Sequence, residues 1–397
     1  MSNNSSSLCL TDRQMMLAVN DVERLLIGKI VPFLLLFGVS GNILNLTVLL
    51  APKVRTRSNK LLAALALADI VFLIFMLPHS LAHYHVFAFS HWFRYLYLTN
   101  KIHLTAIINW ASAAAIWFVL VICVERLIGI KYPLSSRKNK TFLSARFLIP
   151  FVVIVTGILT SFHHFSYFCA TKYFCDGTQL HAMCVRTDSP RWFRNQTNPN
   201  SELVKAIARW GPHVNAILVV LLPVLLVILS NIMLICTLRN RQQFLIPTQS
   251  SVKWENGMSG TQMRTEHKVT MTVTAIVTCF TLTQAPSAFV AIIAAYYQFE
   301  DEVLVVVSSV FTTMVVLGKT LNFVLFCLSS TTFRQRLLRR GKGRLSTRSQ
   351  SQLTASSGLM DYSSSEHRKW SRLASGSSTA PSEVLPLRRL ARGATVV

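Results

Sequence analysis

The chain has 397 residues, of which 51% are hydrophobic and 14% are charged, and its formal net charge is +24. This composition excludes an ordinary soluble globular protein. The lysines and arginines gather in alternate loops between apolar runs, so the positive charge indicates membrane orientation and anionic lipid rather than nucleic acid.

Seven apolar runs are long enough to cross a bilayer, which takes about 20 residues. We expect spans at residues 28–50, 60–83, 99–130, 142–165, 203–238, from 265 onwards, and up to 328. Basic residues follow spans one, three, five and seven, which places those loops in the cytosol and the N-terminus outside. The sequence therefore predicts an all-α, multi-pass plasma-membrane protein: a seven-transmembrane helix bundle.

The segments around the bundle differ in composition. Residues 1–27 form a polar external tail without the apolar core of a signal peptide, and residues 28–330 form the seven-span domain. Residues 331–340 predict a short interfacial amphipathic eighth helix, and residues 341–397 a disordered cytoplasmic tail.

Two features of the tail suggest partners. Serine clusters beside arginines, at residues 363–365 and 375–379, suit phosphorylation and docking of an arrestin-like protein, or simply reflect disordered composition. The last three residues, Thr395–Val397, fit a PDZ domain, although such short matches are also common by chance.

Several protein classes find no support in the sequence. No internal repeat indicates a transporter with paired halves, and no filter motif indicates a channel. No nucleophile–base pair or metal-spaced cluster indicates an enzyme, so we expect no enzymatic activity, cofactor or metal.

The predicted external segments carry modification signals. N-glycosylation sequons lie at Asn3, Asn4 and Asn195. The four external cysteines, which allow three pairings, are Cys9, Cys169, Cys175 and Cys184. A hairpin turn at Asp176-Gly177 would set Cys169 opposite Cys184, at a hydrogen-bonded pair by parity, and leave Cys9 for Cys175; the alternative is that some thiols stay free.

Motifs along the chain match one family in order and spacing. They are Gly41-Asn42, Leu65-Ala66-Leu67-Ala68-Asp69, Glu125-Arg126-Leu127 with Pro133, Pro223, Phe280 with Pro286, and the run from Asn322 to Phe326. Residues 28–340 resemble the rhodopsin-like (class A) G-protein-coupled receptors. Ile116-Trp117 and residues 322–329 are similar to invertebrate FMRFamide and myosuppressin-type peptide receptors.

The sequence also departs from that family. Gln284 stands where span six usually carries a tryptophan, and Phe323 and Phe326 replace a proline and a tyrosine. The cysteine usual at the top of span three is absent. These departures weaken the motifs that would hold the active state.

The resemblance implies a switch centred on Arg126, with Asn322 and Phe326 in span seven. Glu125 and Glu266 are candidate acids for Arg126. In the ionic-lock reading, Glu266 holds span six against Arg126 until a heterotrimeric G protein binds; the alternative is that Glu266 is an ordinary solvated residue.

A second predicted group of polar residues lies in the middle of the spans and consists of Asn42, Asp69 and Lys319. The family uses this aspartate to bind sodium, and we expect the Lys319 ammonium to replace the ion. The alternative is that Lys319 extends to a membrane edge. Pro223, Phe280, Gln284 and Pro286 complete the predicted hinge; Pro286 should kink span six, as a pivot by resemblance or as a static kink.

The resemblance places a ligand pocket on the outer side. Ile108 stands where amine receptors carry an aspartate, which disfavours a monoamine. An extracellular peptide ending in Arg-Phe-amide would need acids and aromatics, for which the candidates are Trp92, Trp110, Tyr297, Glu300 and Glu302. These could equally be solvated charges and interfacial aromatics. Alternative functions are a chemosensory receptor for a small molecule and a seven-span protein without G-protein output.

Overall fold

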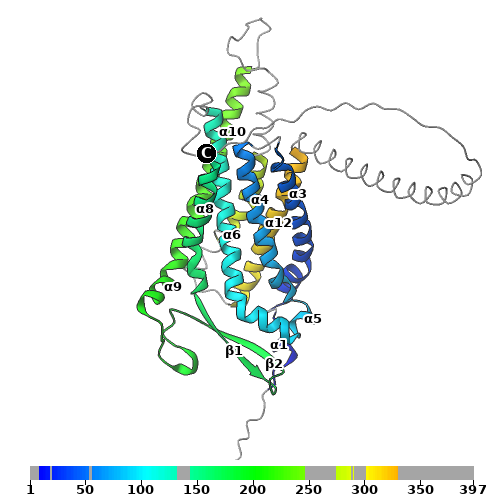
Figure 1. Cartoon of the computed structure of the whole chain (residues 1–397), viewed down its shortest axis with the longest axis vertical. Helices are drawn as coiled ribbons and strands as arrows, with labels where there is room; N and C mark the ends of the chain where they lie inside the picture. The colour runs from blue at the N-terminus through cyan, green and yellow to red at the C-terminus, as the bar shows by residue number, and fades with distance from the viewer. Residues whose placement is uncertain are drawn as a thin grey trace, which may run out of the picture. The chain divides into compact units, whose positions relative to one another are not determined.

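The computed structural model describes residues 9–17, 20–52, 56–131, 144–245, 274–287, 289 and 301–329 (Figure 1). Its contacts divide the chain into two units, Met1–Arg336 and Leu337–Val397, and the second lies wholly outside the described residues. Several predictions fall outside them as well: Asn3, Asn4, Glu266, Tyr297, Glu300, the eighth helix, the phosphorylation sites and the PDZ motif.

Long helices make up most of the first unit. They are α3 (Val31–Leu49), α4 (Arg57–Leu81), α6 (His91–Lys131), α8 (Ala145–Thr160), α9 (Glu202–Val214) with η5 (Asn215–Leu221) and α10 (Leu222–Leu245), and α12 (Asp301–Ser329). Among the described residues, five helices are apolar and long enough to cross a membrane. With α3 and helical residues 274–287, helical segments stand at all seven predicted places, which confirms the helix-bundle prediction.

Shorter elements connect and cover these helices. They are α1 (Asp12–Met15), α2 (Asp21–Glu23), η1 (Arg24–Ile30), α5 (His85–Ala88), η3 (Ser161–His164), η4 (Phe193–Asn195) and the strands β1 (Tyr167–Phe174) and β2 (Gln179–Arg186). The first helical segment runs on from α2 through η1, so it begins at Asp21 rather than near residue 28.

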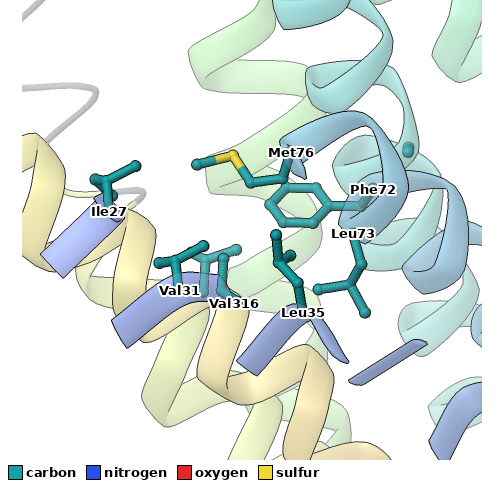
Figure 2. Packing of buried hydrophobic residues seen from close by; sticks show 9 residues of the cluster. Ile27, Val31, Leu35, Phe72, Leu73, Met76 and Val316 are labelled. Atoms are coloured by element: carbon teal, nitrogen blue, oxygen red, sulfur yellow. The ribbon is translucent and has the colours of Figure 1, made fainter. Parts of the chain in front are cut away.

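The bundle core forms where α4 packs against α3 and α6, and where α12 packs against α3 (Figure 1). Figure 2 shows Phe72, Leu73 and Met76 of α4 among side chains from α3 and α12. Leu73 and Val316 are fully buried, and Phe72 is 3% exposed. This apolar layer surrounds the buried polar group described below.

Two prolines coincide with local rewinding of their helices. Pro32 and Pro223 each occupy the second position of an α-helix that follows a π-helical turn. Just before them, the Val31 and Leu222 amides bond to carbonyls five residues back. Proline lacks the N–H that an i→i−4 bond needs, and the wider π turn accommodates the gap. Pro223 thus lies at a change of helical winding in span five.

The hairpin corrects one expectation. The turn spans Cys175–Thr178, between the last pair Phe174↔Gln179, and three consecutive residues from Cys175 have positive φ. The Thr187 amide bonds to the Ser166 carbonyl at 3.0 Å, so the Cys169↔Cys184 pair, three residues along, is non-hydrogen-bonded. Its Cα–Cα distance of 4.0 Å fits the closer of the two antiparallel pair types. The parity prediction was wrong because the turn is longer than two residues.

Candidate functional site

The two ends of the bundle carry different groups, and a buried polar core lies between them. We call them the hairpin end, where β1 and β2 lie, and the Arg126 end, where α4 begins and α6 ends (Figure 1). Residues 94 to 126 of the single helix α6 run between the ends, a rise of about 48 Å.

Asp69 is the centre of the buried polar core. The Lys319 Nζ atom donates to one carboxylate oxygen of Asp69 at 2.9 Å, and the Asn322 side-chain amide donates to the other at 2.7 Å. Asp69 and Lys319 have side chains 0% and 1% exposed. The predicted pair is therefore present, and the ammonium does not extend to a membrane edge.

Neighbouring groups fix the position of Lys319. Its Nζ atom lies 4.6 Å from the centre of the Phe72 ring, which favours a cation over its face. The Asn42 side chain donates to the Lys319 carbonyl at 3.2 Å and joins α3 to α12. Asn42 and Asn45 are both fully buried. Every span represented in this core is thus linked by a specific polar contact.

A close helix contact lies beside this core. A Cβ atom added to Gly41 would lie 2.5 Å from the ring of Phe323, closer than real side chains approach. The glycine therefore lets α3 and α12 pack closely enough for Asn42 to reach Lys319.

The Gly41→Ala substitution is expected to destabilise the protein by about 1–3 kcal/mol, because the added methyl group overpacks the contact. Gly129→Ala is the matched control, since nothing lies within 4 Å of its added Cβ. Thermal unfolding of both purified variants tests this. Equal midpoints for the two would show that the α3–α12 contact can relax.

At the Arg126 end, the two charges of the Glu125-Arg126 motif contact the start of α4. Arg126 donates to the Ser58 hydroxyl, and Glu125 lies 3.5 Å from Arg57. The Arg57 and Glu125 side chains are 34% and 19% exposed, so the pair contributes modestly, about 1 kcal/mol or less. Neither Arg57 nor Ser58 was among the predicted site residues, although both lie in the basic segment between predicted spans one and two.

The predicted hinge residues are only partly accounted for. Phe280 and Gln284 are each 3% exposed and lie one turn apart in the helix of residues 274–287. The Gln284 amide nitrogen has no hydrogen-bond partner in the described part of the chain. Pro286 lies within the last described turn of that helix, and its kink stays a prediction. Phe326 lies in α12, with its side chain outside the described residues.

Two disulfides hold the hairpin end together. Cys9 is bonded to Cys175 and Cys169 to Cys184, which is the predicted pairing. Beside the first bond, the Gln179 side chain accepts from the Leu10 amide at 2.6 Å and donates to the Leu10 carbonyl at 3.1 Å. The segment after Cys9 is therefore fastened along the turn of the hairpin.

A buried arginine joins the N-terminal segment to the hairpin; we call residues 9–17 and 167–186 together the cap. Arg94, 1% exposed, donates to the carbonyls of Leu180 at 2.8 Å, Ala88 at 2.7 Å and Met15. One guanidinium thus joins β2, the loop between α4 and α6, and the N-terminal segment. Partial burial, and then the charge of Arg94, lower the pKa of His181 below its ordinary value.

Arg94 was not among the predicted site residues. The signal available was an arginine inside the aromatic run Trp92-Phe93-Arg94-Tyr95, near the outer end of span three.

The predicted ligand residues differ in their surroundings. Trp92 and Glu302 are exposed, while Ile108 packs against the bundle core. The Trp110 indole donates to the Val153 carbonyl at 3.0 Å and lies against Gly157, so it fills the contact between α6 and α8. Asn195 is exposed and lies at the end of η4, where its predicted glycan stays untested.

Comparisons with known proteins agree with this architecture. A family profile described as "Serpentine type 7TM GPCR chemoreceptor Srw" matches residues 29–339. A candidate G-protein coupled receptor of Caenorhabditis elegans, F59B2.13, is 54% identical over 376 residues, which cover 94% of this chain and 87% of that protein.

Two other relatives carry receptor names. Sex peptide receptor-related protein 2 of Caenorhabditis elegans is 23% identical over 351 residues, covering 83% of this chain and 75% of that protein. Galanin receptor 2a of Danio rerio is 30% identical over 122 residues, which cover 30% of this chain and 32% of that protein. With the family profile spanning the whole helix bundle and one relative alike over nearly the full length, the chain belongs to the Srw family of seven-transmembrane G-protein-coupled chemoreceptors.

Proposed function

We propose that the protein is a plasma-membrane receptor that binds an extracellular peptide at the hairpin end and activates a heterotrimeric G protein at the Arg126 end. The observation that carries this proposal is the arrangement along α6: a disulfide-held cap at one end, the Glu125-Arg126 motif at the other, and the Asp69–Lys319 core between them.

Disulfide chemistry supports the orientation. Disulfides persist in oxidising compartments and are rare in the cytosol. Both bonds lie at the hairpin end. The basic loops lie at the opposite ends of the spans, as the positive-inside rule requires for the cytosolic side. The two criteria are independent, and both favour an external hairpin.

The hairpin supports a peptide as the ligand. Its sheet has two strands, and the outer edge of β1 has no strand partner in the described part of the chain. An extended peptide can add to such an edge through backbone hydrogen bonds. Two relatives are also named for sex peptide and galanin, so the narrower FMRFamide or myosuppressin resemblance stays a proposal. Within it, exposed Glu302 would pair with a peptide arginine and exposed Trp92 with a phenylalanine.

A small-molecule chemosensory ligand is the second candidate, favoured by the chemoreceptor description of the matching family. Arrestin-like and PDZ partners of the tail also remain proposals.

A library of amidated peptides, screened on cells that express the full chain with a G-protein activation readout, tests the function. A peptide response that Arg126→Ala abolishes at equal surface expression is the expected result. A response only to small volatile or polar molecules would favour the chemosensory function. No response in a receptor shown to reach the surface, across both libraries and all G-protein classes, would contradict G-protein output.

The proposed ionic lock makes a separate prediction. Glu266→Ala is expected to raise basal G-protein activity, because it removes the acid proposed to hold span six against Arg126. This lock should open readily, since a single ion pair near water contributes about 1 kcal/mol or less. Basal signalling is measured at matched surface expression, with Glu202→Ala, an exposed glutamate at the other end, as control. Unchanged basal activity would leave Glu266 an ordinary solvated residue.

A further inference from the structure

His103 of α6 and His164 of η3 present ring nitrogens to each other. Their Nδ1 atoms are 2.9 Å apart, and the ring centres are 5.2 Å apart at an interplanar angle of 33°. We propose that these two histidines form a binding site for a transition-metal dication, with Zn²⁺ as the representative ion. This site is independent of the ligand and G-protein functions proposed above.

The nitrogens are available to a metal. Two other histidines of this end of the bundle have different partners: His79 Nδ1 lies 2.9 Å from the Tyr97 hydroxyl, and His83 Nδ1 bonds to the His79 carbonyl while its Nε2 lies 3.3 Å from the Glu23 carboxylate. His103, by contrast, is exposed, and its Nδ1 atom faces the Nδ1 atom of the His164 imidazole. Imidazole nitrogen is a preferred ligand of Zn²⁺.

Zinc binding requires a local adjustment of the two rings. Two nitrogens bound to tetrahedral zinc at 2.0–2.1 Å are about 3.3 Å apart, so the rings need to separate by roughly 0.4 Å and to turn until both lone pairs point at an ion beside the line that joins the nitrogens. In the metal-free pair, one neutral imidazole carries its proton on Nδ1 and donates to the other. Metal binding moves that proton to Nε2 of the same ring, so that both Nδ1 lone pairs are free to bind the ion.

The protein supplies two of the four ligands. No group of three or more histidine, cysteine or acidic side chains that could hold a metal occurs within the described ranges. Water therefore completes the coordination. The affinity of this site for Zn²⁺ should therefore be lower than that of a closed structural zinc site. Zinc would then act as a reversible effector rather than as a permanent part of the fold.

The position of the pair gives the metal a mechanical consequence. His164 ends η3, and β1 begins at Tyr167. A bound ion would therefore fasten α6 to the base of the hairpin, on the opposite strand end from the Cys175 turn. Bound zinc therefore stabilises the arrangement of the cap in which the two rings face each other.

Metal titration of the purified full chain in lipid nanodiscs tests the site. Wild-type protein should bind one more equivalent of Zn²⁺ than His103→Ala or His164→Ala, or bind it at least tenfold more tightly, a difference of about 1.4 kcal/mol. His85→Ala is the matched control, because that histidine stacks on Phe89 outside the pair and should leave zinc binding unchanged. The visible absorption spectrum of bound Co²⁺ should show histidine-dependent bands in wild type and in the His85→Ala control. Those bands should be absent from both pair variants.

Thermal unfolding supplies a second readout. Zn²⁺ should raise the unfolding midpoint of wild type and of His85→Ala, whereas Mg²⁺ should not. His103→Gln and His164→Gln, which keep a polar side chain, replace any alanine variant that fails to fold. Zinc stoichiometry, affinity and thermal shift that are the same in wild type and in the pair variants would overturn the proposal.

Discussion

Replacing Lys319 with methionine is expected to destabilise the protein by about 3–5 kcal/mol, because it leaves the Asp69 carboxylate buried without its cation. The side chain of Asp69 is 0% exposed, so bulk solvent does not solvate the carboxylate in the present packing. Sodium should partly restore stability in the variant, since a small cation can occupy the vacated position beside the carboxylate. Wild type should show no comparable sodium response, because Lys319 already supplies the charge.

Thermal unfolding in sodium, potassium and N-methylglucamine chloride at equal ionic strength measures both effects. Asp69→Asn/Lys319→Met is the informative control: it removes both charges, so most of the stability should return without sodium. Ligand affinity, once a ligand is known, should become sodium-dependent in Lys319→Met alone. A variant that is as stable as wild type without sodium, or a wild type that responds equally to sodium, would contradict the proposed role of Lys319.

The Arg94→Met substitution is expected to release the cap and to cost at least about 3 kcal/mol, since hydrogen bonds from a charged group contribute about 1.5–3 kcal/mol each. Three carbonyls, those of Met15, Ala88 and Leu180, lose their donor at once. Because they belong to three separate segments, the loss should appear first as opening of the N-terminal segment and the hairpin rather than as unfolding of the helices.

Hydrogen exchange of residues 9–17 and 167–186 measures that opening, and surface expression reports its cost in cells. Arg94→Lys should rescue only in part, because one ammonium lacks the planar fork that reaches separate acceptors. Arg191→Met, at an exposed arginine between β2 and α9, should have little effect. Full rescue by lysine would show that the positive charge matters more than the three-way contact.

Much of the fold could be predicted because a membrane imposes strict lengths and forbids unpaired charge. Those two constraints locate the spans and require a partner for Asp69, which the structure provides in Lys319. The hairpin disulfide was likewise predictable, since the Asp176-Gly177 turn brings Cys169 and Cys184 together. The hydrogen-bonding type of the Cys169–Cys184 pair could not be predicted in the same way. It depends on the number of turn residues, which is set by three successive positive φ angles that the sequence does not specify uniquely.

The contacts of Arg94 and Arg126 could not be predicted for a different reason. Arg94 bonds to backbone carbonyls, which every residue carries, so no pattern of side chains marks its partners. Arg126 bonds to Ser58, a small hydroxyl with many equivalents along the chain. Charge pairing can be predicted from a sequence because few residue types can neutralise a buried charge. Hydrogen bonding to common groups depends on which segments the fold brings together.

The Cys9–Cys175 bond changes the topology of the polypeptide. It joins residues 166 positions apart, and the ring so formed contains the first four spans and the first strand of the hairpin. The ring cannot close during synthesis until the fourth span has been made and Cys175 has followed it. A single cut between these cysteines would leave the two pieces covalently joined until reduction. Formation of this bond therefore marks a defined stage of folding. A chain that carries the bond has already brought its N-terminus back to the loop after span four.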